Sequence, residues 1–364
     1  MSENYRQPAA LTALQAKSEA QKLAFSAIAF EAVVSLLRLG ILRAVSEAGS
    51  DGARPSDIAD KLGLSEYGVK VLLDMGLTTH LVWLNDDRYV LDKIGHFLLE
   101  DRMTKVNINF AQDVCYEAMG HLQESIESGT PEGLKVFGDW PTIYPGLTHM
   151  PEPAKTSWSE FNCYYSRKAF PDALPIVFET HPRRLLDVGG NSGAWALQCV
   201  EYDPDIHVTI VDLPGQTSIA RENARKSNAE NRVDTVDLDI LDPDQHLPTG
   251  ADTIWMSQFL DCFAESQIRA ILERCANVMD EENSLFILET FWNRQEFDAA
   301  AYSINATSLY FTCLANGTSR MYHSEDFIGI AKAAGFDVIA QHDNLGVGHT
   351  LLHLKRTPSA VACN

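Results

Sequence analysis

Two acidic residues that each close an apolar run carry the clearest chemistry in this sequence. Asp187 is followed by a glycine-rich turn, an apolar segment of helical character comes next, and a second apolar run ends at Asp212. This order is typical of a strand–helix–strand unit, in which a ligand binds in the crevice at the carboxyl ends of the strands. The residues expected at this crevice are Asp187, Gly189, Gly190, Gly193, Asp212 and Leu213.

The spacing of the glycines indicates which ligand the turn accepts. A dinucleotide-binding turn has the pattern G-x-G-x-x-G/A, with the pyrophosphate at the helix N-terminus, but here Gly189 is followed two positions later by Asn191. Asp187 would also repel a phosphate and attract a cation. S-adenosylmethionine carries an ammonium and a sulfonium group and no phosphate, and Asp212 is placed to accept both of its ribose hydroxyls. The pattern therefore favours S-adenosylmethionine as the ligand over an empty turn.

Further carboxylates follow the next predicted strands. After the third strand, Asp239 can bond the adenine amino group and Ile240 can cover the ring. The fourth strand leads through Ser257 to Asp261, and the fifth ends at Glu289, so we expect these two acids at one mouth. If a methyl acceptor is a phenol of pKa about 10, a base near neutrality helps, and burial or a second carboxylate would raise the pKa of an aspartate. A helix-cap or surface role for the two acids stays open at this stage.

Two other residues could act near the same mouth. Cys262 could be a nucleophile, but no histidine is close in sequence, so a structural role is favoured. His349 could act as a base at the start of the last strand, although a structural role is again favoured. His349 and His353 have H-x-x-x-H spacing, but four residues of a strand span roughly 13 Å, too far to share a metal. We therefore expect no metal site.

Composition limits the class of protein. The chain has 364 residues, of which 45% are hydrophobic, enough for two domains or one large one. A net charge of −21 opposes binding to nucleic acid and to anionic membranes. The seven cysteines are scattered with no Cys-x-x-Cys pair, which is typical of reduced thiols. Without an apolar signal core or a membrane-spanning apolar stretch, we expect a cytoplasmic protein.

The N-terminal region predicts a small helical domain. Apolar residues at helical spacing predict helices within 11–50, and two short helices follow at 56–75. Short strands at 81–84 and 88–91 flank an Asn-Asp-Asp turn, which completes a winged-helix pattern. The helix expected to read DNA carries too few basic residues for that task. Its apolar face instead favours packing against a partner chain.

The rest of the chain predicts a doubly wound α/β sheet. Residues 101–180 read as irregular helices rich in aromatic residues, which either line a pocket or form an ordinary core. From 181 onward, strands alternate with helices. We therefore expect a dimerisation domain at 1–105, a pocket and linker region at 106–180 and a donor-binding domain at 181–364. The expected strands are 183–188, 207–211, 233–238, 252–257, 284–289, 336–341 and 349–354, and the helices are 194–201, 216–228, 265–279 and 324–334.

These motifs together resemble the class I S-adenosylmethionine-dependent O-methyltransferases that act on small molecules, the group of plant caffeate-type and bacterial polyketide-tailoring enzymes. The resemblance covers nearly the whole chain, including the turn at 187–193, the Val-Asp-Leu-Pro segment at 211–214 and the segment at 315–320. It implies a Rossmann-like methyltransferase sheet and an N-terminal winged-helix domain that forms an intertwined homodimer. It also implies S-adenosyl-L-methionine as methyl donor, S-adenosyl-L-homocysteine as product and a small-molecule acceptor.

The resemblance assigns roles residue by residue. Gly189 falls on the donor-loop glycine and Asp212 on the ribose acid. Ser257 stands where members of the family usually have a donor-binding lysine or serine. The adenine-contacting pair corresponds to Asp239 and Ile240, and the positions that face substrate or donor correspond to Phe161, Tyr165 and Asn316.

The departures from the family concern catalysis. Where the family usually has His-Asp-Trp, this chain has Asp261-Cys262-Phe263, and of the two flanking glutamates Glu289 is kept while Ser319 replaces the other. Asp261 is then a substitute base, or the acceptor needs none, or the accepting atom is carbon or nitrogen, or methyl transfer has been lost. We expect methyl transfer to a small aromatic hydroxylated metabolite, mainly by proximity and orientation, with both acids near the acceptor.

Overall fold

The computed structural model describes residues 5, 7–147 and 149–358. Contacts between Cα atoms divide the chain into two compact units. The N-terminal unit comprises Gln7–Tyr116 and Glu152–Phe161. The sheet unit comprises Tyr5 and the described residues of 117–151 and 162–358.

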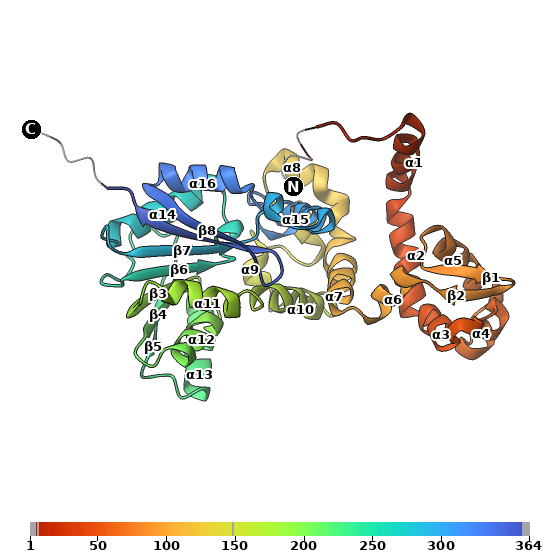
Figure 1. The fold of residues 1–364 in the computed structure, drawn as a ribbon, viewed down its shortest axis with the longest axis horizontal. Coiled ribbons are helices and arrows are strands. Elements are labelled where there is room, and N and C mark those ends of the chain that lie inside the picture. Colours follow the sequence, from red (N-terminus) through yellow and green to blue (C-terminus); the bar gives the residue numbers. More distant parts are fainter. Residues whose placement is uncertain (1–4, 6, 148, 359–364) are drawn as a thin grey trace, which may run out of the picture. The chain divides into compact units, whose positions relative to one another are not determined.

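The N-terminal unit is built from helices and one small hairpin (Figure 1). The Thr12 side chain caps the first helix and Ser65 caps the fifth, which places both helix starts where the sequence has a capping residue. The hairpin pairs Val82 with Leu91 and Asn85 with Arg88. Its elements in chain order are α1 (Ala13–Ala24), α2 (Ser26–Arg38), α3 (Ile41–Glu47), η2 (Gly49–Asp51), α4 (Pro55–Leu62), α5 (Glu66–Thr78), β1 (Val82–Asn85), β2 (Arg88–Leu91), α6 (Lys93–Glu100), α7 (Arg102–Phe110) and the π-helix η3 (Ala111–Cys115).

The hydrophobic core of this unit leaves its first helix uncovered. Residues such as Leu36, Ile41, Val69 and Leu73 are fully buried. In contrast, α1 has no buried residue. Among the residues that the structure describes, no single helix is long and apolar enough to cross a membrane, and α1 with α2 meets that test only as a pair bent by 60°.

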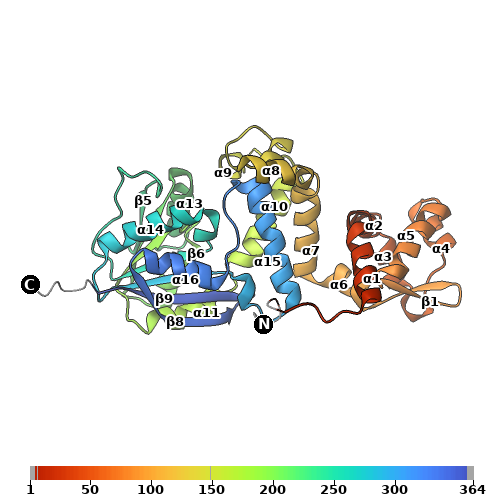
Figure 2. The ribbon, with the colours of Figure 1, turned by 90° about the horizontal axis from the view of Figure 1, so that it is seen from above.

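The sheet unit contains a seven-stranded sheet in the order β5-β4-β3-β6-β7-β9-β8 (Figure 1, Figure 2). The first five strands of this order are parallel, and β9 is antiparallel to both of its neighbours. The strands are β3 (Arg184–Val188), β4 (His207–Asp212), β5 (Val233–Asp237), β6 (Thr253–Ser257), β7 (Ser284–Glu289), β8 (Phe336–Leu345) and β9 (His349–Arg356).

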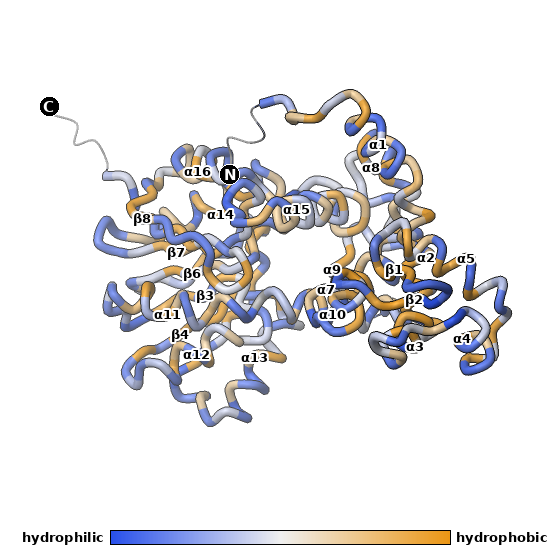
Figure 3. Tube along the Cα trace, turned by 45° about the vertical axis from the view of Figure 1, so that its right-hand side comes forward, coloured by the Kyte–Doolittle hydropathy of each residue, from blue (hydrophilic) through white to orange (hydrophobic). Residues whose placement is uncertain are grey.

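Two sets of helices cover the two faces of this sheet, as alternating side chains of each strand require. On one face Ile254 and Ile287 pack with α14 and α16, and on the other Trp255 and Leu288 pack with α11, α12 and α13. Figure 3 shows hydrophobic residues concentrated in the strands and hydrophilic residues in the connecting loops. These helices are α11 (Phe170–Phe178), α12 (Ala194–Tyr202), α13 (Pro214–Lys226), α14 (Glu265–Val278) and α16 (Ser324–Ala333).

The remaining elements connect the sheet to the middle of the chain. All seven strands expected from the sequence are present, whereas one long helix, α15, was not expected. The connecting elements are η4 (Ala118–His121), α8 (Leu122–Ser128), η5 (Glu132–Val136), α9 (Ile143–Gly146), α10 (Ala154–Ser166), η6 (Leu260–Cys262), η7 (Trp292–Arg294), α15 (Asp298–Tyr310) and the π-helix η8 (Phe311–Ala315).

Candidate active site

The turn after β3 needs its glycines for space. Gly189 has φ +76°, and a Cβ atom there would lie 2.3 Å from the ring of Phe259. A Cβ atom on Gly190 would lie 2.6 Å from Oδ2 of Asp187. Gly193 has φ +77° and is the N-cap of α12. The turn therefore folds tightly against Asp187 and against the segment that follows β6.

Asp187 is the electrostatic centre of this turn. Its side chain is 2% exposed, and its Oδ2 atom has no hydrogen-bond partner. Burial, and after it the charge of Asp212, raise the pKa of Asp187 to about 8. A buried carboxyl oxygen without a partner is costly, so this atom is suited to a cationic group of a ligand.

The acids of the next two strands are fixed by backbone amides. Asp212 accepts hydrogen bonds from the amides of Asn191 (2.8 Å) and Leu213 (2.7 Å). Asp239 is exposed and accepts one from the amide of Leu241 (2.9 Å), whereas Ile240 is buried. Asp212 closes β4, and Asp239 and Ile240 follow β5, as the sequence predicted, but none of the three lines the cavity described next.

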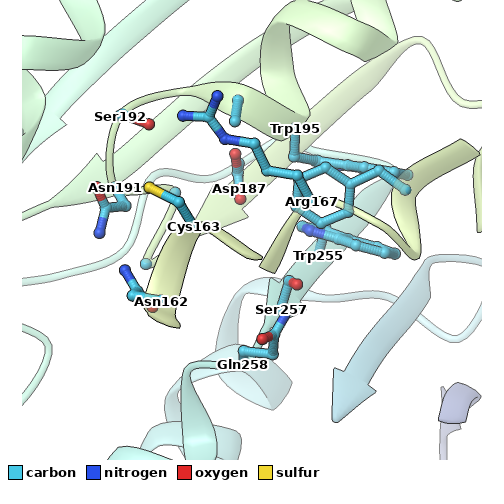
Figure 4. Close-up of a pocket in the computed structure, with 14 residues that line it drawn as sticks. Asn162, Cys163, Arg167, Asp187, Asn191, Ser192, Trp195, Trp255, Ser257 and Gln258 are labelled. Atoms are coloured by element: carbon cyan, nitrogen blue, oxygen red, sulfur yellow. The ribbon is translucent and has the colours of Figure 1, made fainter. Parts of the chain in front are cut away.

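A cavity of about 140 Å³ opens beside the turn (Figure 4). Four residues expected at the ligand line it: Asp187, Gly189, Gly190 and Ser257. Of the expected ligand residues, Gly193, Asp212, Leu213, Asp239 and Ile240 do not. The cavity is lined by Asn162, Cys163, Arg167, Phe170, Asp187, Gly189, Gly190, Asn191, Ser192, Ala194, Trp195, Trp255, Ser257 and Gln258.

Phe170, one of the aromatic residues of 101–180 considered for a pocket, lines this cavity, whereas Trp195, Trp255 and Arg167 were missed by sequence reasoning. Trp195 and Trp255 stack face to face with ring centroids 3.8 Å apart, and Phe170 meets Trp195 edge to face. Arg167 lies just after α10 and is the one lining residue with a permanently charged basic group. No local pattern distinguishes these side chains from packing residues, because their meeting depends on which helix covers which strand.

Asp261 and Glu289 lie together after β6 and at the end of β7. Glu289 is 2% exposed, and its Oε1 atom accepts the amides of Phe259 (3.1 Å) and Leu260 (2.9 Å). Its Oε2 atom is buried without a hydrogen-bond partner. Burial, and after it the charge of Asp261, raise the pKa of Glu289 well above its ordinary value. Burial also raises the pKa of Asp261, which is 7% exposed, to about 6.

Asn316 adjoins the same cluster, and its side chain bonds mainly backbone groups. Its Nδ2 atom donates to the carbonyl of Cys262 (2.7 Å) and to the hydroxyl of Ser319 (2.8 Å). Its Oδ1 atom accepts the amides of Thr318 and Ser319, both at 3.0 Å. The carboxamide thus fastens the turn that carries Asp261, and contact of Asn316 with an acceptor stays a prediction.

The other expected residues lie apart from the cavity wall. Phe161 belongs to the N-terminal unit, where it stacks on Phe110 with ring centroids 3.9 Å apart. Tyr165 meets Tyr164 edge to face at 5.1 Å in the sheet unit. His349 is 1% exposed, and burial lowers its pKa to about 4, so its ring is neutral.

Comparison with known families identifies both parts of the chain. Residues 175–337 match the O-methyltransferase domain, and residues 17–89 match the Dimerisation2-like domain. The chain therefore carries an O-methyltransferase domain together with a dimerisation domain.

Individual relatives of this methyltransferase cover most of its length. The 3-hydroxy-5-methyl-1-naphthoate 3-O-methyltransferase of Streptomyces sahachiroi is 25% identical over 282 residues, which is 76% of this chain and 78% of the relative. The S-adenosylmethionine-dependent methyltransferase SibL has the same fold, with a TM-score of 0.72 and 21% identity over 94% of this chain and 99% of SibL. NcsB1, an O-methyltransferase from neocarzinostatin biosynthesis solved with S-adenosylmethionine and 2-hydroxy-5-methyl naphthoic acid, has a TM-score of 0.65 and 20% identity over 96% and 100% of the chains.

The residues of the turn fit the donor of this family. S-adenosylmethionine presents an ammonium group that suits the unpaired Oδ2 atom of buried Asp187. The side chains of Asp187 and Arg167 face the same cavity, so it offers one acidic and one basic group to the two charged ends of an amino acid (Figure 4). The methyltransferase therefore uses S-adenosylmethionine as its cofactor.

Proposed function

We propose that this methyltransferase transfers a methyl group to a hydroxyl group of a small aromatic metabolite, with Asp261 as the base. The observation that carries the proposal is the buried pair formed by Asp261 and Glu289. This pair adjoins the donor turn, because the ring of Phe259 packs on Gly189 while the amide of Phe259 bonds Glu289. The segment that carries Phe259 therefore contacts both the donor turn and the pair of acids.

Different side chains would bind different parts of the donor. Asp187 would bind the ammonium of the methionyl group, and Arg167 would bind its carboxylate. Asp212 keeps lone pairs beyond its two amide bonds and would accept the ribose hydroxyls. The adenine would lie against Ile240 and bond Asp239, and Ser257 would face the donor from the end of β6.

The catalytic step needs little from the protein besides position and one base. When bound, S-adenosylmethionine supplies an electrophilic methyl group on a sulfonium. Asp261 would take the hydroxyl proton of the acceptor on a carboxylate oxygen as the new oxygen–methyl bond forms and the sulfur–methyl bond breaks, with S-adenosylhomocysteine as the leaving group. A pKa of about 6 makes Asp261 a better base for a phenol than an ordinary aspartate. Glu289 would act through the backbone that carries Asp261.

The acceptor class follows from the relatives and the acid pair together. The Streptomyces sahachiroi relative is named for a hydroxynaphthoate, and NcsB1 was solved with a hydroxynaphthoic acid. A hydroxylated fused aromatic acid is therefore our first candidate acceptor. Methyl transfer to carbon or nitrogen, or donor binding without transfer, is the competing proposal, because the usual catalytic histidine is absent from the position of Asp261.

The proposal is tested by product analysis. The full-length protein is incubated with methyl-labelled S-adenosylmethionine and a panel of hydroxynaphthoic acids, and each product is identified by mass spectrometry and NMR. We expect an O-methyl product whose formation falls about 10²- to 10⁴-fold in Asp261→Asn, the range for loss of a general base. A carbon- or nitrogen-linked methyl group would replace the hydroxyl proposal, and donor binding with no product from the panel or from a cell extract would favour loss of methyl transfer.

A further inference from the structure

Asp261 has a hydrogen-bonding neighbour that the donor site does not use. The Sγ atom of Cys262 lies 3.4 Å from Oδ1 of Asp261. Burial raises the pKa of the Cys262 thiol well above its ordinary value, so the sulfur keeps its proton and can donate it. Tyr144 of α9 donates in turn to the Cys262 sulfur. Two hydrogen bonds in series thus end on one oxygen of Asp261.

The backbone around Cys262 is fixed from two sides. Glu289 accepts the amides of Phe259 and Leu260 at 3.1 and 2.9 Å, and Asn316 donates to the carbonyl of Cys262 at 2.7 Å. The turn between these two contacts has little freedom to move. The thiol therefore keeps its place beside Asp261 as long as the two contacts persist.

We propose that Cys262, supported by Tyr144, is a positioning residue that fixes one oxygen of Asp261 and keeps this buried carboxyl group ionised. The second oxygen, Oδ2, is then the one that receives the proton of the acceptor. This inference rests on the proposed role of Asp261 as the base. In this role Cys262 acts only as a hydrogen-bond donor, and its thiol does not react.

The groups facing Asp261 act in opposite directions on its protonation. Burial favours the neutral acid, whereas the Cys262 thiol favours the carboxylate. The pKa of the neighbouring Glu289 on β7 is itself raised, by burial and then by the charge of Asp261. Tyr144 on α9 and Tyr322, which follows η8, both feel the charge of Asp261, and burial raises the pKa of each, so both are neutral near pH 7. Among these groups the Cys262 thiol is the donor to the carboxylate, and Tyr144 donates to the sulfur of that thiol.

The test is a titration of Asp261 itself in the ligand-free, full-length protein. Carbon-13 NMR of the γ-carboxyl groups of labelled aspartate follows the pH, and Asp261→Asn assigns the signal. Cys262→Ala should raise the titration midpoint of Asp261 by about half to one pH unit, the effect expected for loss of a weak S–H donor. Cys262→Ser should hold the midpoint at or below the parent value, because a hydroxyl is the stronger donor. Tyr144→Phe should raise it by less than Cys262→Ala.

Cys275→Ala is the matched control, because Cys275 is a buried cysteine on α14 in the same unit with no hydrogen bond to Asp261. Its midpoint should equal that of the parent. An unchanged midpoint in folded Cys262→Ala and Cys262→Ser, judged by circular dichroism, would overturn the inference. A raised midpoint in Cys262→Ala combined with full turnover by Asp261→Asn would instead overturn the role of Asp261 as base, while the contact between thiol and carboxylate would stand.

Discussion

At the scale of single residues, the donor turn concentrates its electrostatics on Asp187. The pKa of this group, raised to about 8 by burial and by Asp212, means that the ligand-free protein carries a protonated Asp187 at neutral pH. A cationic donor favours the ionised form, so binding must expel this proton. The affinity of the protein for its donor is therefore linked to pH.

We predict that donor affinity rises with pH between 5.5 and 7.5, by up to about tenfold per pH unit. Calorimetric titration with S-adenosylhomocysteine in buffers of different ionisation enthalpy measures both the affinity and the released proton. The Asp187→Asn variant should bind weakly and show neither the pH dependence nor the proton release. Equal affinity of the parent at both ends of this pH range would contradict the assignment.

The raised pKa of Asp187 has the opposite effect on stability: a higher pH strengthens donor binding but destabilises the ligand-free fold. An unfolded aspartate has a pKa near 3.9, so between about pH 4 and pH 8 the folded protein holds a proton at Asp187 that the unfolded chain has lost. The contribution of Asp187 to the free energy of unfolding therefore falls as the pH rises through this range. Thermal unfolding of the ligand-free parent should become easier relative to Asp187→Asn from pH 5 to pH 8, and saturating donor should reverse the trend.

Variants of Asp212 and Asp261 should affect donor binding and turnover separately. Asp212→Ala loses the group expected at the ribose, so donor affinity should fall at least tenfold, as the loss of charge-assisted hydrogen bonds implies. Asp261→Ala should lower turnover while donor affinity stays within a few-fold, since Asp261 does not line the donor cavity. Calorimetry and labelled-methyl transfer distinguish the two effects, and equal loss of donor binding in both variants would reject the division of roles.

At the scale of elements, the glycine turn depends on its fit against the segment that follows β6. We predict that Gly189→Ala destabilises the fold by about 1–3 kcal/mol, because the residue has a positive φ and its Cβ atom would meet the Phe259 ring. It should also weaken donor binding. Gly215→Ala is the matched control, since a Cβ atom there meets nothing within 4 Å. Denaturant unfolding measures the free energy of unfolding of both variants, and equal stability of the two would rule out the steric argument.

How far the sequence predicts each element depends on where its contacts come from. The strands β3, β4, β6 and β7 were predictable, because each contains an apolar run closed by a polar or acidic residue. The helix α15 was missed because its apolar residues do not follow one face, which leaves no periodic signal. The residue pattern of a single segment predicts an element only where the local sequence determines its structure.

The candidate site divides in the same way. Asp187, Gly189 and Gly190 were found because the turn is a continuous motif. Arg167 was missed because it reaches the cavity from the end of another helix. The contact of Glu289 with the amide of Leu260 joins residues 29 positions apart in the chain, so no local pattern reveals it.

At the scale of the whole molecule, the exposed apolar side chains of α1 and α2 need a partner. Leu23 is 69% exposed and Ile28 is 66% exposed, and both lie in the segment that matches the Dimerisation2-like domain. A second copy of this chain would cover such residues in a homodimer. We predict that the double variant Leu23→Glu and Ile28→Glu is a monomer by light scattering, whereas Ile339→Glu, at an apolar site on β8 that is 54% exposed, stays a dimer. A dimer in both variants would place the interface elsewhere.

The monomeric variant also tests how the site is divided between the units. All fourteen residues that line the donor cavity belong to the sheet unit, so this cavity is complete without α1 and α2. We therefore predict that the monomer binds S-adenosylhomocysteine within a few-fold of the parent affinity. Methyl transfer should fall much further if a partner chain completes the acceptor pocket. Calorimetry and product formation on the same sample separate these outcomes, and loss of donor binding would show that the cavity requires the partner chain to form.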